Sequence, residues 1–393
     1  MSERTATIPK PAAAPAEQTQ ALAIRDFSLA IALVLIWAFF AWRTDMIFVS
    51  PRNLSNLAVE LSMTAVLALG QLLIILCGQI DLSIGSGVGL IGGIAAILIS
   101  EHQWSAPSAM LLATSVALVI WLLMGTLIVT QGIASFIITL AGMLVFRGLQ
   151  WKIIHSSTIP ISVGGQDNLL SIVTTFHLPI PIGSLLAAFV IACTGWSILA
   201  SRRRRAEFGF PLEPASVAFS KFFILSQLVV IFTLVCNQYR GIPLAAVILA
   251  ATALVIGLLT GHTRFGRYLY AIGGNQEAAR ISGVPVKKVI IGAFGIMGLL
   301  VALGGFLQTA YTGSSTTTTG DLLELDAIAA CVIGGASLMG GRGTVLGVIF
   351  GSLIIASLVN GMTLMAVYPD TKYIARGVVL ALAVLLDVKL SKE

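Results

Sequence analysis

Charged residues are scarce in this sequence of 393 residues. Only 10% of the chain is Asp, Glu, Lys or Arg, whereas about 25% is usual in soluble domains. Hydrophobic residues make up 57% of the chain, and the mean hydropathy is +0.97. This composition excludes an ordinary soluble domain and indicates an integral membrane protein with several spans.

The sequence also lacks the usual signatures of catalysis and metal binding. Its four cysteines contain no Cys-x-x-Cys pair and its four histidines no paired spacing, which argues against a disulfide framework and a metal site. No Gly-x-Ser-x-Gly turn supports a serine hydrolase. No Gly-x-x-x-x-Gly-Lys-Ser/Thr loop is present to cradle ATP phosphates. We therefore expect no catalytic residue, no cofactor and no metal ion in this chain.

The basic residues that are present lie in two places. Four arginines stand together at Arg202–Arg205, and the segment 261–288 has five basic residues against one acidic residue, a net charge of +4. Both groups flank apolar runs, so they set membrane topology rather than bind nucleic acid. By the positive-inside rule, both segments are expected in the cytoplasm.

The apolar runs predict an all-α polytopic membrane protein with about ten to twelve transmembrane helices. The segments fall at 27–42, 57–80, 83–100, 108–129, 133–151, 182–200, 219–236, 242–260, 289–311, 325–340, 344–361 and 372–388. The glycine-rich segments 83–100 and 325–340 each begin beside an acidic residue. Such a segment can be a broken or re-entrant helix, where protein or a water-filled cavity covers its backbone.

The regions outside the spans follow from the same pattern. Residues 1–26 contain few large apolar residues and predict a disordered cytoplasmic tail. The membrane domain then covers 27–388, and a second cytoplasmic tail covers 389–393. The predicted loops of this domain are an external loop at 152–181, a cytoplasmic basic loop at 201–218 and a cytoplasmic loop at 261–288.

The loop 261–288 contains a predicted two-turn helix. Asn275 is a good N-cap for a helix over Gln276–Ser282, Gly283 suits the position after its end, and Pro285 prevents its continuation. A helix this short is marginal alone in water, so it must pack against something. Two alternatives remain open: a surface turn on the membrane domain itself, or a docking helix for a cytosolic partner.

Two acidic residues, Asp81 and Asp326, lie beside apolar runs. A charge at the centre of a bilayer costs about 2.5–3.5 kcal/mol on insertion scales, so each carboxylate must be paired, interfacial or next to a cavity. One hypothesis is that they cap the helices that follow or tighten a loop. The other is that they line a translocation path. Three further polar residues, Arg147, Asn237 and Asn360, are expected to form interfacial or interhelical hydrogen bonds.

Small residues recur every four positions in two places. Gly85, Gly89 and Gly93 form one row, and Gly343, Gly347 and Gly351 form another. This spacing predicts faces for close helix packing.

Four blocks of sequence carry a resemblance to a known family. The segment GRYLYAIGGNQEAARISGV (266–284) resembles the cytoplasmic coupling loop of sugar-importing ABC transporter permeases of the ribose/xylose class. Segments 80–86, 134–148 and 324–335 are similar to blocks of the same family. The likeness covers nearly the whole chain from Asn53, and the arginine-rich insertion before Asn237 is most similar to the D-xylose permeases.

The resemblance implies a homodimeric permease subunit of an ATP-driven importer for D-xylose or a related monosaccharide. It implies a bacterial cytoplasmic (inner) membrane location, a cytoplasmic N-terminus and a separate cytosolic ATPase that hydrolyses ATP. The other implied partners are a periplasmic or surface sugar-binding protein, a second copy and membrane lipid, with no nucleic acid. In such a permease the predicted helix sits in a groove of the ATPase, with Ala278 and Ala279 at the closest approach. The implied coupling residues are Gly274, Asn275, Glu277, Ala278, Ala279, Arg280 and Gly283, and Asp81 and Asp326 are candidates for the translocation path.

Two other functions remain as alternatives from the residues alone. An ion-coupled secondary transporter of a small polar solute would use buried carboxylates such as Asp81 and Asp326 for coupling. A membrane enzyme has only the missing motifs against it.

Overall fold

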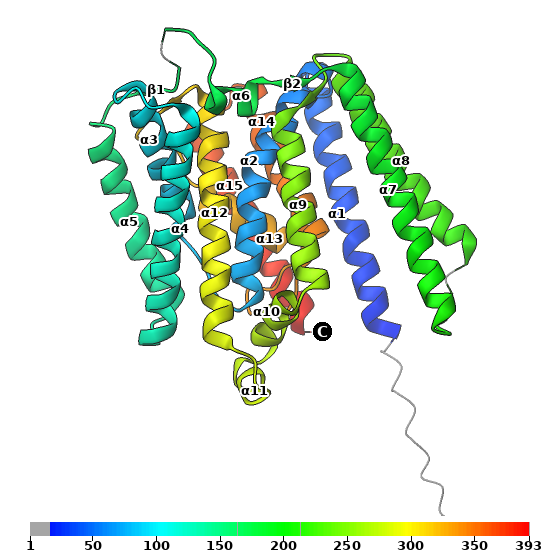
Figure 1. The fold of residues 1–393 in the computed structure, drawn as a ribbon. Helices are drawn as coiled ribbons and strands as arrows, with labels where there is room; N and C mark the ends of the chain where they lie inside the picture. Colours follow the sequence, from blue (N-terminus) through cyan, green and yellow to red (C-terminus); the bar gives the residue numbers. More distant parts are fainter. Residues whose placement is uncertain (1–15, 163, 213, 393) are drawn as a thin grey trace, which may run out of the picture.

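The computed structural model describes residues 16–162, 164–212 and 214–392, which form fifteen α-helices and four two-residue strands. Most helices run side by side across one slab, with α6 at one end and α11 at the other (Figure 1). We call these ends the α6 end and the α11 end. The helices are α1 Ala16–Arg43, α2 Pro51–Leu76, α3 Ile84–Ser100, α4 Ala106–Gln131, α5 Ser135–Ile153, α6 Leu169–Thr175, α7 Ile180–Glu207, α8 Ala215–Asn237, α9 Leu244–His262, α10 Arg264–Gly274, α11 Gln276–Ile281, α12 Val286–Thr312, α13 Leu323–Ile333, α14 Val345–Leu364 and α15 Pro369–Lys392.

Eight of the described helices are long and apolar enough to cross a membrane: α2, α4, α5, α7, α8, α9, α12 and α14. Helix α3 has 17 residues and α13 only 11, whereas a bilayer core needs about 20. Each follows a non-helical stretch, at 77–83 and 316–322 respectively. The predicted all-α polytopic fold is confirmed. Helix α3 is continuous over its predicted segment, whereas α13 ends at Ile333, inside the predicted segment 325–340.

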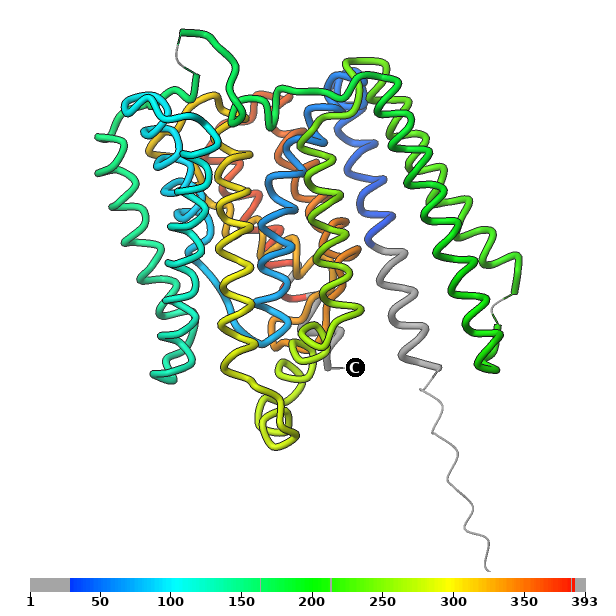
Figure 2. Tube along the Cα trace, in the orientation of Figure 1, coloured from blue at the N-terminus to red at the C-terminus, as the bar shows by residue number. Residues whose placement is uncertain are grey.

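Helices α2 and α12 form the centre of the bundle. In the apolar stretch of 18 residues within each of these two helices, 89% and 72% of the residues are buried. Helix α12 packs against α2, α3 and α4, while α2 packs against α9, α13 and α14 (Figure 2). The other six candidate spans are less buried, as expected for helices that face lipid.

Glycines allow the predicted close approaches between these helices. A Cβ on Gly351 of α14 would overlap the carbonyl oxygen of Ala330 on α13, and one on Gly347 would overlap that of Gly334. On α3, a Cβ on Gly85 would overlap the Glu324 carboxylate, and one on Gly89 would overlap the carbonyl oxygen of Thr319. These glycines therefore lie where neighbouring elements approach closely, as predicted.

Helices α7 and α8 form a hairpin at the edge of the bundle (Figure 1). In the apolar stretches of α7 and α8, only 11% of the residues are buried. At the α6 end, strand β2 (His177–Leu178), just before the hairpin, pairs antiparallel with β3 (Ile242–Pro243), just after it. A second antiparallel pair joins β1 (Ile159–Pro160) to β4 (Ser314–Ser315). The segment 152–181 thus holds β1, α6 and β2.

Several predicted boundaries differ from the structure. Helix α1 begins at Ala16, so residues 16–26 are helical rather than part of a disordered tail, and residues 1–15 lie outside the described residues. Residues 201–207 of the predicted basic loop continue α7, and residues 389–392 continue α15. These stretches contain Ala, Arg, Glu and Lys, which favour helix. The helices therefore extend beyond their hydrophobic runs.

Candidate functional site

The predicted short helix in loop 261–288 is present as α11, at the far tip of the α11 end (Figure 1). Asn275 is its N-cap, and the Asn275 Oδ1 accepts a hydrogen bond of 2.9 Å from the amide of Ala278. Gly283 has a φ of 81°, and its amide donates to the carbonyl of Arg280 at 3.1 Å. The Val284 amide donates a hydrogen bond to the Ala279 carbonyl at 3.0 Å. The predicted cap, helix and stop are confirmed.

The side chains of α11 point in two directions. Ala279 is only 5% exposed and packs with the apolar core of its own domain. Ile281, by contrast, is 79% exposed. Ala279 therefore faces its own domain, because a helix turns one face toward its support. That Ala278 and Ala279 lie closest to a partner stays a prediction.

The exposed residues of α11 form one surface. Glu277 and Arg280 make an ion pair of 2.7 Å on it, with both side chains more than half exposed. The Ala278 side chain lies in the open beside them. We call the surface made by Glu277, Ala278, Arg280 and Ile281 the α11 face. It exposes two opposite charges and two apolar side chains, those of Ala278 and Ile281.

Helix α10 connects this region to the membrane bundle. A Cβ on Gly273 would overlap the carbonyl oxygen of Leu76, at the end of α2, and the amide of Gly341. The Gly341 amide itself donates to the Leu76 carbonyl at 3.1 Å. The Tyr270 hydroxyl donates to the Gly343 carbonyl at 2.8 Å. Helix α10 therefore touches both α2 and the loop 334–344.

Asp81 lies fully buried in the stretch between α2 and α3. Its Oδ1 accepts from the amide of Ser83 at 2.8 Å and from the Ser83 hydroxyl at 2.6 Å. Its Oδ2 accepts from Trp121 Nε1 of α4 at 2.7 Å. Helix α3 begins at Ile84 after Ser83, so Asp81 is not its N-cap. The carboxylate tightens the loop, which agrees with the structural hypothesis.

Asp326 lies inside α13 rather than before it. The helix begins at Leu323, after Leu322 with a φ of 63°, so the prediction that Asp326 caps a helix from Ala327 is wrong. The sequence signal misled because an Asp favours a cap but is also tolerated in a first turn. Asp326 is 4% exposed and lies 3.4 Å from Arg376 of α15. Its charge is therefore paired within the protomer.

The other predicted hydrogen-bonding residues do connect different elements. Asn360 of α14 donates to Glu60 of α2 at 3.1 Å and accepts from Asn53 at 2.8 Å. Asn237 of α8 donates to the Ser184 hydroxyl of α7 at 3.4 Å. Glu60, which the sequence analysis did not single out, also accepts from the Tyr311 hydroxyl at 2.7 Å.

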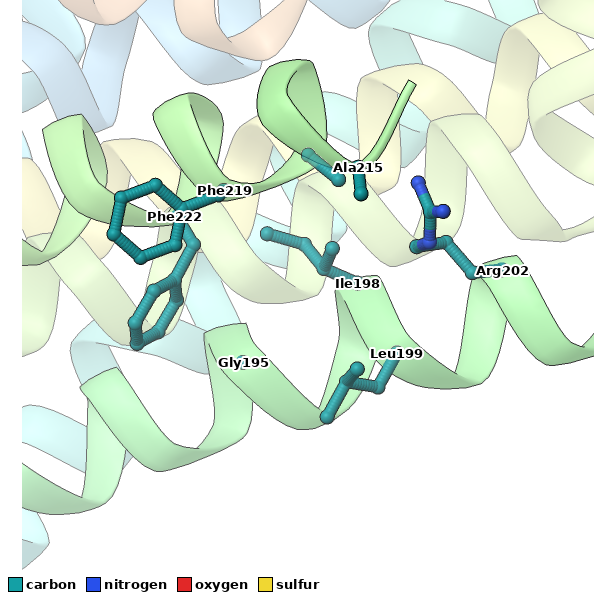
Figure 3. Close-up of a pocket in the computed structure, with 8 residues that line it drawn as sticks. Gly195, Ile198, Leu199, Arg202, Ala215, Phe219 and Phe222 are labelled. Carbon is teal, nitrogen blue, oxygen red and sulfur yellow. The ribbon is translucent and has the colours of Figure 1, made fainter. Parts of the chain in front are cut away.

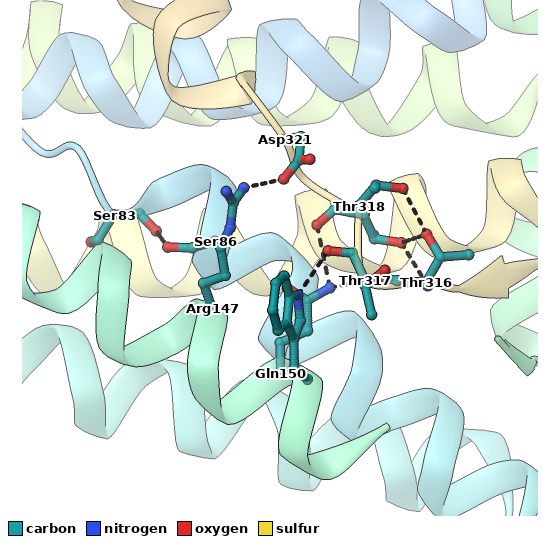
Figure 4. A network of polar contacts seen from close by, with 10 residues as sticks. Ser83, Ser86, Arg147, Gln150, Thr316, Thr317, Thr318 and Asp321 are labelled. Atoms are coloured by element: carbon teal, nitrogen blue, oxygen red, sulfur yellow. Dashed lines mark hydrogen bonds and ion pairs between the residues drawn. The ribbon is translucent and has the colours of Figure 1, made fainter. Parts of the chain in front are cut away.

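Arg147 belongs to a polar group that the sequence analysis missed (Figure 4). It forms an ion pair with Asp321. Gln150 Nε2 donates to the Thr316 carbonyl at 2.8 Å, and Trp151 Nε1 donates to the Thr317 carbonyl at 3.2 Å. We call Arg147, Gln150 and Trp151 of α5, with Thr316–Asp321, the α5 polar cluster. Its sequence signal was the run of four threonines followed by Gly-Asp.

A hollow of about 140 Å³ elsewhere in the described structure is lined partly by polar side chains, those of Lys372, Tyr373 and Arg376. A groove of about 310 Å³ lies between α7 and α8 (Figure 3), lined mainly by apolar side chains such as Ile198, Leu199, Phe219 and Phe222. Such a lining suits lipid chains. Among the described residues, no three His, Cys, Asp or Glu side chains are grouped as a metal would require.

Comparison with known proteins gives a consistent family. Residues 53–384 match the family described as branched-chain amino acid transport system, permease component. The chain is 38% identical over 373 residues to the xylose transport system permease protein XylH of Escherichia coli (strain K12), covering 94% of this chain and 93% of that protein. It is 38% identical over 375 residues to XylH of Haemophilus influenzae, covering 94% and 98%. It is 32% identical over 344 residues to the ribose import permease protein RbsC of Bacillus subtilis, covering 88% and 87%. No solved structure matches.

Proposed function

Because this chain belongs to the family of branched-chain amino acid transport system permease components, we propose that it is the membrane-spanning permease subunit of an ATP-driven sugar importer, with D-xylose as the substrate. The observation that carries the proposal is the likeness to xylose permeases along nearly the whole chain. The all-α polytopic fold suits a translocation path, and the permease itself performs no covalent chemistry.

The ATPase partner would bind at the α11 end, which is then cytoplasmic. The loop 261–288 carries its net charge of +4 at this end, and Arg202–Arg205 lie in the last turns of α7 on the same side. The N-terminus is then cytoplasmic as well. The proposed contacts are those of the α11 face, with Gly274, Asn275 and Gly283 at its borders. Ala279 supports this face from inside.

The α6 end would then meet the sugar-binding protein, in the periplasm or at the cell surface. It carries β1, α6 and β2, which form a hydrogen-bonded cover over the bundle. A second copy of this chain would complete the path, since ABC importers of this kind use two membrane halves. Asp81 and Asp326 would hold the short helices α3 and α13 in place beside that path.

The decisive experiment is uptake of labelled D-xylose into proteoliposomes that contain this chain, its ATPase and its sugar-binding protein. Uptake should require ATP and persist when an uncoupler removes the ion gradients. Uptake that fails with an uncoupler while ATP is held constant would support the ion-coupled secondary transporter instead. Uptake of a different sugar alone would refute D-xylose as the substrate.

A further inference from the structure

The α5 polar cluster is partly open on the surface of the protomer. The side chains of Arg147 and Asp321 are 43% and 28% exposed, and Trp151 is 48% exposed. Thr318 is also exposed. Figure 4 shows Arg147 and Gln150 on one helix reaching the segment that carries Thr316–Asp321. The cluster is therefore accessible from outside this chain and is not fully buried.

This surface lies on helix α5, which is one of the candidate membrane spans. Arg147 is six residues before the end of α5 at Ile153, which places it about 9 Å along the helix axis from that end. An exposed charged pair at this depth cannot face hydrocarbon without a large cost. It must face a water-filled cavity or another protein.

The backbone beside the cluster leads to the same conclusion independently. The segment 316–322 is not helical, and Gly320 and Leu322 both have positive φ, 91° and 63°. Irregular backbone within a bilayer is tolerated only where protein buries it or where it lines an aqueous cavity. Because Thr318 and part of Asp321 remain exposed, this chain alone does not bury the segment.

The chemistry of the cluster suits a neutral ligand with many hydroxyl groups. Arg147 supplies planar donors and Asp321 supplies acceptors, and their paired charges cancel, so neither an anion nor a cation is favoured. The half-exposed indole of Trp151 offers an apolar face to the C–H side of a sugar ring. Gly148, between Arg147 and Leu149, is exposed, and no atom lies within 4 Å of where its Cβ would be. No side chain of this chain therefore covers the surface at Gly148.

Gln150 holds this surface in shape from behind. It is 1% exposed, and its amide donates to the Thr316 carbonyl at 2.8 Å and to the Thr319 carbonyl at 3.4 Å. A Cβ on Gly89 of α3 would overlap the Gln150 side chain, so α3 packs directly against it. Gln150 is thus a positioning residue for the segment that ends at Asp321.

We propose that Arg147, Asp321, Trp151 and Thr318 form a contact site for the sugar, an aldopentose, as it crosses the membrane. The inference rests on the proposed function, and it assigns the substrate contacts to the α5 polar cluster rather than to Asp81 or Asp326. The open, shallow arrangement gives weak binding, which suits a site that a sugar must leave again.

The test compares Trp151→Leu and Asp321→Asn with wild type in the complete complex in proteoliposomes, with Trp196→Leu as the matched control. Trp196 is a 72% exposed tryptophan on α7, away from the cluster. Uptake of labelled D-xylose should fall about tenfold or more in the two cluster variants, as expected for the loss of a charge-assisted hydrogen bond or a ring contact. ATP hydrolysis stimulated by the loaded binding protein should stay at the wild-type level. Trp151→Phe, which keeps an aromatic ring, should restore most of the uptake.

The outcomes separate this inference from the function on which it rests. Absence of D-xylose uptake by the wild-type complex would refute the proposed function. Wild-type uptake together with undiminished uptake by both cluster variants would overturn the contact site alone. A parallel loss of uptake and stimulated ATP hydrolysis, not restored by Trp151→Phe, would also overturn it, because that result means a purely structural role.

Discussion

Replacing Ile281 with Ser should weaken the binding of the ATPase to this chain. Ile281 is 79% exposed at the end of α11, and full burial of an Ile side chain contributes about 1.5–3 kcal/mol. If the partner covers most of the exposed part, the substitution costs about 2 kcal/mol of binding free energy, or about 30-fold in Kd.

The same substitution should leave the protein itself intact. The cap at Asn275 and the turn at Gly283 do not involve the Ile281 side chain, so α11 keeps its hydrogen bonds. Ala279→Trp would be a poorer test, because Ala279 is buried against its own domain and a larger side chain would displace α11. Loss of function in that variant would not distinguish docking from misfolding.

The measurement is a titration of the purified ATPase against the permease in nanodiscs, with stimulated ATP hydrolysis as a second signal. Phe208→Ser is the matched control, since Phe208 is 75% exposed just after α7, next to the other basic segment and away from α11. An Ile281→Ser permease that binds the ATPase as tightly as wild type would refute the assignment of the α11 face as the docking surface.

Three further predictions concern topology and stability. Reporter fusions at Arg205 should report the cytoplasm and fusions at Gly165 the outside, and the reverse would refute the proposed orientation. Arg376→Met should lower the unfolding free energy by about 3–5 kcal/mol, because Asp326 is left buried without its partner; adding Asp326→Leu should recover much of it, measured by thermal unfolding in detergent. Gly320→Ala should cost about 1–3 kcal/mol in the same assay, because its φ is 91° and a Cβ would overlap the backbone of α3. An unchanged Tm for Gly320→Ala would contradict that contact.

The sequence was most informative where local chemistry determines structure. A cap at Asn275, helix-forming residues and a glycine followed by Pro285 were enough to place α11 to within a residue. The spans followed from hydropathy for the same reason, since lipid forces backbone groups to pair within a helix. The direction in which Ala279 points was not predictable, because it depends on which face of α11 meets the rest of the domain.

The sequence alone did not indicate which residues far apart in the chain interact with each other. Arg147 and Asp321 lie 174 positions apart, and nothing near either residue indicates the other. A cap was one of two hypotheses for Asp326, and neither included its ion-pair partner Arg376, which stands on a different helix. Residues 16–26 contain few large apolar residues, and the part of α1 that they form continues into the apolar run that follows.

The contact at Gly273 has a mechanical consequence. Peptide groups of α10, the end of α2 and the loop 334–344 touch there without a side chain between them, so no rotamer can change to absorb a shift. A displacement of α10 must then carry Leu76 and Gly341 with it. Leu76 leads into the stretch before α3, and the loop 334–344 follows α13. A displacement of α10 at the α11 end would therefore be transmitted to α3 and α13 together, so the movements of these two short helices would be coupled.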